Sequence, residues 1–153
     1  MLKWLGFAVC AARSAASIRK AYSNNFRSVP TPAIMHLEPT YACTCRCVYC
    51  RVGKGKHKKK DAELSYAEMI NLIDQARAIG VKMIAVSGGE PLARKDVLKA
   101  MRYAKARGII TSVVHNGTLI NKNNVHAVLS SFDAISISLD SLCANKNLSL
   151  IHI

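Results

Sequence analysis

The sequence is poor in aromatic and acidic residues. Three Phe and one Trp among 153 residues leave Leu, Ile, Val and Ala to build most of the core of a single domain. Nine acidic residues oppose 22 Lys and Arg, which gives a net charge of +13, and no acidic residue precedes Glu38. This balance fits nucleic acid, an anionic membrane surface or an acidic substrate as a partner, or a basic solvated loop on an ordinary enzyme.

Long apolar runs are also missing. Residues 1–12 hold one cation and a short apolar run that is too short to span a membrane. Three cations then interrupt the pattern, Arg13, Arg19 and Lys20. We therefore expect residues 1–32 to form a helical arm and linker rather than a signal peptide, with residues 1–20 packed on the domain or resting on a membrane surface. The expected location is the cytoplasm, with peripheral membrane contact as the alternative.

The widely spaced cysteines of a disulfide framework are absent. Four of the six cysteines lie within residues 43–50, and such crowding in a cytosolic protein indicates a metal or cluster site. Cys43, Cys47 and Cys50 offer three thiolates on one tight loop. Three thiolates can hold three irons of a cubane and leave the fourth iron open to a small ligand.

Hydrophobic patterning predicts strands that alternate with helices. The expected strands cover residues 33–37, 81–86, 109–114 and 133–139. Between them we expect a helix opened by a Ser65–Glu68 capping box, a helix over about 94–107, and a third helix capped by Asn121 or Asn123. This order implies a parallel α/β sheet with right-handed crossovers. Sites in such folds lie at the carboxyl ends of the strands, so the four loops that follow the strands should converge.

Those four loops together resemble the radical S-adenosylmethionine (radical SAM) enzymes. The cysteine loop resembles their CxxxCxxC signature, with Tyr49 before the third cysteine, and Gly88-Gly89-Glu90-Pro91 resembles their GGEP motif. The turn at 115–119, His-Asn-Gly-Thr-Leu, is similar to their TNG-type turn. Residues 136–141 are similar to the fourth-strand motif of the branch that contains molybdenum-cofactor and peptide maturases. The resemblance extends from about residue 34 to residue 141.

The resemblance implies an enzyme whose [4Fe–4S] cluster is held by Cys43, Cys47 and Cys50, with S-adenosyl-L-methionine bound at the open iron. Reductive cleavage of that cofactor gives a 5′-deoxyadenosyl radical, which abstracts hydrogen from a substrate. Maturation of a cofactor or a peptide is the expected role, with a small molecule or peptide as the substrate. The electron donor would be a protein such as flavodoxin or ferredoxin.

The resemblance also assigns residues to the cofactor. Gly88 and Gly89 would let the backbone approach the methionine ammonium group, and Glu90 would support that contact or the turn. Tyr49 would lie near the adenine. Contacts to the ribose or carboxylate are expected from two further residues, Asn116 and Ser138.

The fold implied is a partial parallel (βα) barrel, with about four of the βα units of a (βα)6 radical SAM core over residues 33–142. An N-terminal helix would precede it. Residues 143–153 look like a non-native tail, and the last six resemble a translated sequencing adapter. We expect a chain truncated in this way to be poorly active or inactive.

Two substitutions depart from the common pattern of the family. Thr44 and Cys45 stand where relatives commonly have Asn and Leu, and Cys45 is expected to pack as a small hydrophobic residue rather than to act as a fourth ligand. His115 stands where Thr is frequent. The other two cysteines are expected to be ordinary core or surface thiols, Cys10 and Cys143.

Two alternative functions remain open from the sequence. An RNA-modifying radical SAM enzyme could use the lysines of residues 54–60 on phosphates, but no aromatic residue interleaves them, so nucleic acid is not the expected partner. A non-catalytic zinc-binding module could use all four cysteines of the loop. That second hypothesis does not account for Gly88-Gly89-Glu90.

Overall fold

The computed structural model describes residues 32–52 and 63–143 continuously, with isolated positions at 12, 15, 16, 19, 23 and 145. The backbone is helical at the described positions 12, 15, 16, 19 and 23 of the expected N-terminal arm. The other residues of that helix, Cys10, the lysines at 54–60, and residues 144 and 146–153 of the expected non-native tail lie outside the described residues. Within the two continuous ranges, four strands alternate with three α-helices, as the sequence predicts. No helix in the described part is long and apolar enough to cross a membrane.

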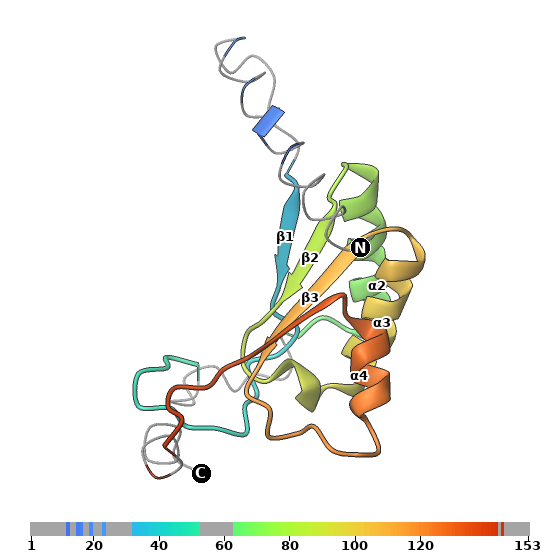
Figure 1. The fold of residues 1–153 in the computed structure, drawn as a ribbon. Coiled ribbons are helices and arrows are strands. Elements are labelled where there is room, and N and C mark those ends of the chain that lie inside the picture. Colours follow the sequence, from blue (N-terminus) through green and yellow to red (C-terminus); the bar gives the residue numbers. More distant parts are fainter. Residues whose placement is uncertain are drawn as a thin grey trace.

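Four parallel strands form one sheet in the order β1-β2-β3-β4. They are β1 (Ile34–Leu37), β2 (Met83–Val86), β3 (Ile110–His115) and β4 (Ala134–Ile137). The register aligns His36 with Ala85 and Ala85 with Ser112, so these positions share one face of the sheet. All four strands run toward the same edge, at the lower end of the sheet in Figure 1. The predicted parallel α/β fold is confirmed.

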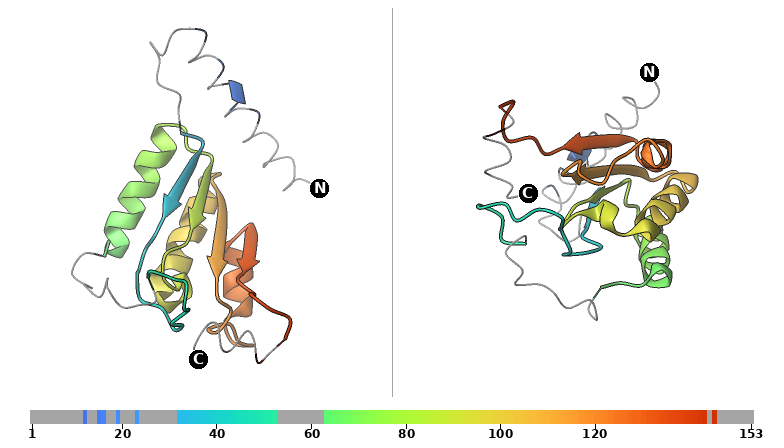
Figure 2. Two further views of the ribbon diagram at one scale, coloured as in Figure 1. Left: turned by 90° about the vertical axis from the view of Figure 1, so that its left-hand side faces the viewer. Right: turned by 90° about the horizontal axis from the view of Figure 1, so that it is seen from below.

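The helices cover one face of this sheet. They are α2 (Tyr66–Ala78), α3 (Lys95–Ala106) and α4 (Val125–Ser131), and a short 3-10 helix, η2 (Pro91–Ala93), precedes α3. The α-helices lie together to the right of the strands in Figure 1 and behind them in the left view of Figure 2, the arrangement that right-handed crossovers produce. The opposite face carries exposed apolar side chains such as Ile34 and Val114.

The core lies between the sheet and the helices. Alternate strand residues point into it, and α2 and α3 each contribute a stripe at helical spacing. Its buried members include Ile84, Val86, Val113, Met69, Ile73, Val97, Met101, Val128 and Phe132. Two alanines of α3, Ala100 and Ala104, let this helix approach the sheet closely. The burial of each larger side chain stabilises the fold by roughly 1.5–3 kcal/mol.

The start of α2 follows the sequence prediction. Ser65 Oγ accepts a hydrogen bond from the Glu68 N–H at 3.3 Å, and Glu68 Oε2 accepts one from the Ser65 N–H at 2.7 Å. At the other end, Gly80 adopts φ 96°, and its N–H donates to the Arg77 carbonyl at 3.0 Å. Both devices satisfy backbone groups that a helix end leaves unpaired.

The predicted cap of α4 is wrong. The N-cap is Asn124, and its side chain makes no capping bond. The Asn121 and Asn124 side chains serve the preceding turn instead: Asn121 Oδ1 accepts from the Asn123 N–H at 2.9 Å, and Asn124 Oδ1 accepts from the Asn121 N–H at 2.8 Å. Asparagine bonds its own local backbone readily, so a cluster of them does not reveal which one begins the helix.

Asp133 links the start of β4 to β3. Asp133 Oδ2 accepts from the Thr111 N–H at 3.0 Å, and its Oδ1 lies 3.2 Å from Lys105 Nζ. Burial raises the pKa of this carboxyl, but the bonds from Thr111 and Lys105 outweigh burial and hold the pKa below its ordinary value. Because the folded pKa is the lower one, the ionised form contributes stability above the unfolded pKa of roughly 3.9, and this stability is lost as the pH falls through the folded value.

We expect Asp133→Asn to lower the free energy of unfolding by about 1–3 kcal/mol at pH 7 and to flatten the loss of stability in acid. Urea unfolding over a pH series measures both effects. The control is Asp74→Asn, since Asp74 pairs with Arg107 while 47% exposed and should contribute less than about 1 kcal/mol. An acid profile that Asp133→Asn leaves unchanged would contradict the expectation.

Candidate active site

The segments that follow β1 and β2 continue to pair through backbone hydrogen bonds beyond the ends of the strands. The Ser87 N–H donates to the Leu37 carbonyl at 3.0 Å, the Gly89 N–H to the Thr40 carbonyl at 2.9 Å, and the Glu90 N–H to the Ala42 carbonyl at 2.8 Å. The glycine turn therefore lies directly against the first part of the cysteine loop, up to the residue before Cys43. This contact confirms that the first two strand exits converge.

The two glycines are required by this close backbone contact. A Cβ added to Gly89 would lie 2.3 Å from the Ala42 carbonyl oxygen, and one added to Gly88 would lie 2.7 Å from the Thr40 carbonyl oxygen. Gly88 also adopts φ +107°, which favours glycine. Packing against the cysteine loop is thus sufficient to explain both residues, before any ligand is considered.

Glu90 is a buried carboxylate that joins two loops. It is fully buried, its Oε1 accepts from the Leu92 N–H at 3.0 Å, and its Oε2 accepts from the Asn116 N–H at 2.8 Å. Each oxygen thus has a backbone donor, as a buried carboxylate requires. Glu90 thereby fixes the turn after β2 against the turn after β3.

Glu90→Gln tests this linkage. The amide group of glutamine would place an N–H against one of the two backbone N–H donors, so we expect a loss of about 1–3 kcal/mol in the free energy of unfolding. Denaturant unfolding gives the value. Glu38→Gln is the matched control, because Glu38 is an exposed carboxylate at the exit of β1 and should change stability by less than about 0.5 kcal/mol. Equal effects in the two variants would show that Glu90 is not a structural link.

Asn116 connects the exit of β3 to the cysteine loop. Its Nδ2 lies 2.9 Å from Thr44 Oγ1 and 3.7 Å from Cys43 Sγ. The Thr118 hydroxyl lies 2.7 Å from the same Thr44 oxygen. The third strand exit therefore meets the loop at its first cysteine.

The four cysteines of the loop differ in exposure. Cys43 is exposed, Cys47 and Cys50 are half-buried, and Cys45 is 1% exposed, so Cys45 is buried as its expected packing role requires. The Cys50 N–H donates to the Cys47 carbonyl at 3.1 Å, which closes a turn between these two thiols. Burial raises the pKa of the Cys47 thiol, with a partly opposing contribution from Tyr49.

The donor set of this loop suits an iron–sulfur cluster. Three thiols, on Cys43, Cys47 and Cys50, project from one short loop at the carboxyl edge of the sheet, and thiolate is the usual protein ligand of such clusters. Within residues 32–52 and 63–143, no group of three or more Cys, His, Asp or Glu side chains is arranged closely enough to hold a metal ion. The fit therefore rests on the chemistry and placement of the donors.

Tyr49 and the exit of β4 also meet. The Tyr49 hydroxyl donates to Asp140 Oδ2 at 2.6 Å, and this carboxylate raises the pKa of Tyr49 well above its ordinary value. The Ser138 N–H donates to the His115 carbonyl at 2.9 Å, while its side chain is exposed. Figure 2 shows the cysteine loop and the segment after β4 on the side of the sheet away from the helices. The fourth strand exit thus reaches the same edge.

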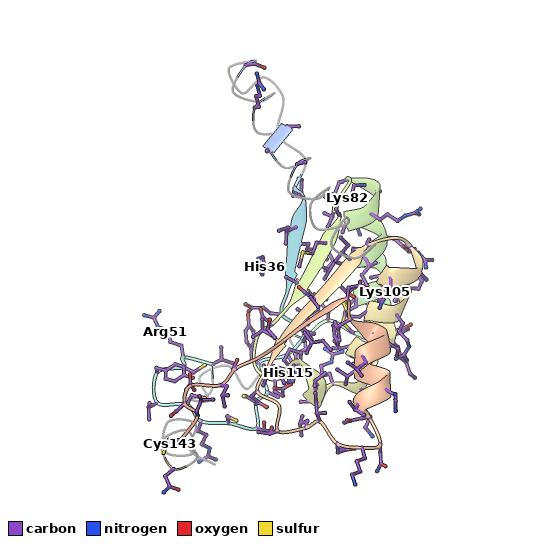
Figure 3. The ribbon with its side chains drawn as sticks, in the orientation of Figure 1. His36, Arg51, Lys82, Lys105, His115 and Cys143 are labelled. Atoms are coloured by element: carbon purple, nitrogen blue, oxygen red, sulfur yellow. The ribbon has the colours of Figure 1, made fainter. Side chains whose placement is uncertain are left out.

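His115 supports the turn after β3 from inside the protein. It lies at the carboxyl end of the sheet (Figure 3), is 2% exposed, and its Nδ1 accepts from the Gly117 N–H at 2.9 Å. Burial lowers its pKa against the opposing effect of Glu90, so the ring is neutral at pH 7. Since Nδ1 accepts, the proton resides on Nε2, which is buried without a partner among the described residues.

Some residues of the site lack a clear sequence signal. Arg94 donates from one guanidinium nitrogen to the Pro39 and Leu64 carbonyls, each at 2.8 Å, and pairs with Asp96, so it fastens the approach of the cysteine loop to the start of α2. A single arginine before a helix does not allow this linkage to be predicted from the sequence. Thr44 is a departure from the family pattern and Thr118 lies within the motif of the turn after β3, but nothing in the sequence indicates that these two residues meet.

A parallel sheet with a thiol loop, a glycine turn and a buried carboxylate at its carboxyl edge is typical of α/β folds that place a ligand site at one end of the sheet. The family model described as "Radical SAM superfamily" matches residues 37–148, which is well over half of the chain. The chain belongs to the radical SAM superfamily.

Two curated relatives show similar levels of identity. The chain is 33% identical over 117 residues to an "AdoMet-dependent heme synthase" of Methanosarcina barkeri, a match that covers 76% of this chain and 33% of that protein. It is 35% identical over 115 residues to a "GTP 3′,8-cyclase" of Lactiplantibacillus plantarum, which covers 73% of this chain and 35% of that protein. The chain thus spans about a third of the length of these relatives.

Solved structures share the fold. SuiB of Streptococcus suis bound to its precursor peptide SuiA superimposes with a TM-score of 0.71 at 20% sequence identity, covering 91% of this chain and 31% of that chain. SuiB bound to S-adenosylmethionine gives the same TM-score and identity. The strands and helices therefore correspond to part of a radical SAM (βα) barrel, as the sequence predicts.

Proposed function

We propose that this chain carries the cluster- and cofactor-binding part of a radical SAM enzyme. Cys43, Cys47 and Cys50 would hold the [4Fe–4S] cluster. The observation that carries the proposal is the backbone pairing of Gly89 and Glu90 with the cysteine loop, because it brings the two most specific motifs of the sequence into direct contact. When bound, the cluster supplies one electron for cleavage of S-adenosyl-L-methionine and so generates the radical that abstracts hydrogen.

The residues of the chain would position the cofactor and shield it from side reactions. Gly88 and Gly89 are half-buried and carry no side chains, and the proposed partner of their backbone is the methionine portion of the cofactor. Tyr49 would lie near the adenine while Asp140 holds its hydroxyl group. Asn116 and Ser138 are placed at the exits of β3 and β4. The exposed Ser138 hydroxyl is the proposed partner of the ribose or carboxylate of the cofactor, because the Asn116 amide is already bonded to Thr44 and Thr118.

The substrate class follows from the relatives. The names of the curated relatives describe the formation of small molecules, and SuiB was crystallised with a precursor peptide. We propose maturation of a cofactor or a peptide as the role of the whole enzyme. A reducing cytoplasmic setting and an electron donor such as flavodoxin or ferredoxin would complete the reaction.

The test is anaerobic reconstitution with iron and sulfide, followed by addition of S-adenosylmethionine and a chemical reductant. We expect about four irons and four acid-labile sulfides per chain, and a change in the electron paramagnetic resonance of the reduced cluster when S-adenosylmethionine is added. One tightly bound zinc with little iron would overturn the proposal. If the cluster forms fully but its spectrum does not change on addition of S-adenosylmethionine, the proposed cofactor site is refuted and the proposed cluster ligands are not.

A further inference from the structure

The Asn116 side chain belongs to a closed ring of hydrogen bonds. Asn116 Oδ1 accepts from the Thr118 N–H at 3.0 Å and from the Thr118 hydroxyl at 2.8 Å. The Thr118 hydroxyl lies 2.7 Å from the Thr44 hydroxyl, which in turn lies 2.9 Å from Asn116 Nδ2. The ring therefore joins the turn after β3 to the cysteine loop across a sequence separation of 72 residues.

The backbone fixes the direction of every bond in this ring. The Thr118 N–H can only donate, so the atom that it contacts must be the oxygen of Asn116 rather than the nitrogen. The Thr118 hydroxyl gives its one proton to that same oxygen, so the Thr44 hydroxyl must donate to Thr118. Thr44 then accepts from Asn116 Nδ2. Within the ring each hydroxyl donates once and accepts once, and Thr44 Oγ1 also lies 3.9 Å from Cys45 Sγ. Such closed chains of hydrogen bonds strengthen one another.

One N–H of Asn116 remains, and it faces a thiol. Asn116 Nδ2 lies 3.7 Å from Cys43 Sγ, and the Cys45 N–H approaches the same sulfur at 3.4 Å. The Asn116 amide cannot turn away from this sulfur without breaking the ring. Two N–H groups therefore approach Cys43 Sγ, one from the cysteine loop itself and one from the turn after β3.

We propose that Asn116 is a positioning residue that holds the first cysteine of the loop and raises the reduction potential of the cluster bound there. This inference rests on the function proposed above. Reduction adds negative charge to the cluster and its thiolates, and an N–H directed at a ligating sulfur stabilises that charge more strongly in the reduced state. Thr44 and Thr118 contribute by fixing the direction of that N–H.

The test is a redox titration of the reconstituted chain followed by electron paramagnetic resonance, with iron content measured on every sample. At a fixed potential, Asn116→Ala should lower the ratio of reduced to oxidised cluster about tenfold, which corresponds to about 59 mV for one electron. Thr118→Val should shift the ratio in the same direction by a smaller factor. The Asn116 amide keeps its N–H near Cys43 in this variant, but it loses the hydrogen bonds of the Thr118 hydroxyl that fix its orientation. Asn123→Ala, an exposed asparagine outside the ring, should change nothing.

The possible outcomes separate the two proposals. A wild-type chain that takes up no iron overturns the proposed function, and this inference with it. Full iron content in Asn116→Ala with an unchanged potential overturns only the inference. If Asn116→Ala loses the cluster, Thr118→Val decides: a lowered potential supports the inference, and a wild-type potential overturns it.

Discussion

Cys47→Ala is expected to abolish iron binding. Cys47 lies between the other two proposed ligands in the sequence, and two remaining thiolates cannot hold three irons of a cubane. Iron after anaerobic reconstitution should fall from about four per chain to background, together with the brown colour and the acid-labile sulfide. The same result is expected for Cys43 and Cys50.

Cys45→Ala provides the matched control for this loss. The Cys45 thiol is 1% exposed and packs inside the loop, so its removal should leave the iron content unchanged. The small cavity left behind should cost about 1 kcal/mol of folding stability. Loss of iron in Cys45→Ala equal to that in Cys47→Ala would instead indicate a four-cysteine site. Retention of iron in Cys47→Ala would refute the proposed ligand set.

Gly89→Ala is the second change with a large expected effect. The added methyl group would lie 2.3 Å from the Ala42 carbonyl oxygen and 2.7 Å from the Tyr41 carbonyl carbon, and neither backbone atom can move without displacing the cysteine loop. We expect a loss of stability at or above the upper end of the roughly 1–3 kcal/mol typical of overpacking. Iron uptake should fall as well, because the displaced segment leads directly into Cys43.

Gly108→Ala distinguishes this clash from an ordinary glycine effect. Gly108 adopts φ +78°, but a Cβ there meets no atom within 4 Å. The substitution should therefore cost about 1 kcal/mol through backbone strain alone, and iron uptake should remain normal. Denaturant unfolding and iron analysis of both variants measure the difference. Equal losses of stability and iron would mean that contact with the cysteine loop is not what requires glycine at position 89.

The fold was predictable where its determinants are local. The alternation of apolar segments, the capping box at Ser65 and the glycine after α2 each lie within a few residues of the structure they specify. Strand bounds were predicted too long: residues 81–86 and 133–139 shorten to 83–86 and 134–137, because sheet pairing rather than apolar character ends a strand. The start of α4 was missed because its asparagines bond within their own turn.

The site was predictable as a location but not as a set of contacts. Parallel topology alone requires the exits of the strands to share one edge, so the meeting of the cysteine loop with the glycine turn could be expected. The ring of Thr44, Asn116 and Thr118 could not, since it depends on side chains brought together across the sheet. The role of Glu90 as a bridge between two backbone turns has the same origin.

The pairing that continues beyond β1 and β2 predicts different rates of hydrogen exchange in two parts of this site. Amide hydrogens of Gly89 and Glu90, bonded to Thr40 and Ala42, should exchange with solvent deuterium about as slowly as those of the sheet. Val48 and Tyr49 have exposed side chains, and their amide hydrogens should exchange much faster than that of Cys50, which bonds to the Cys47 carbonyl. We therefore expect the segment that leads into Cys43 to be ordered before metal binds, and the segment that leads into Cys50 to become rigid as metal is captured.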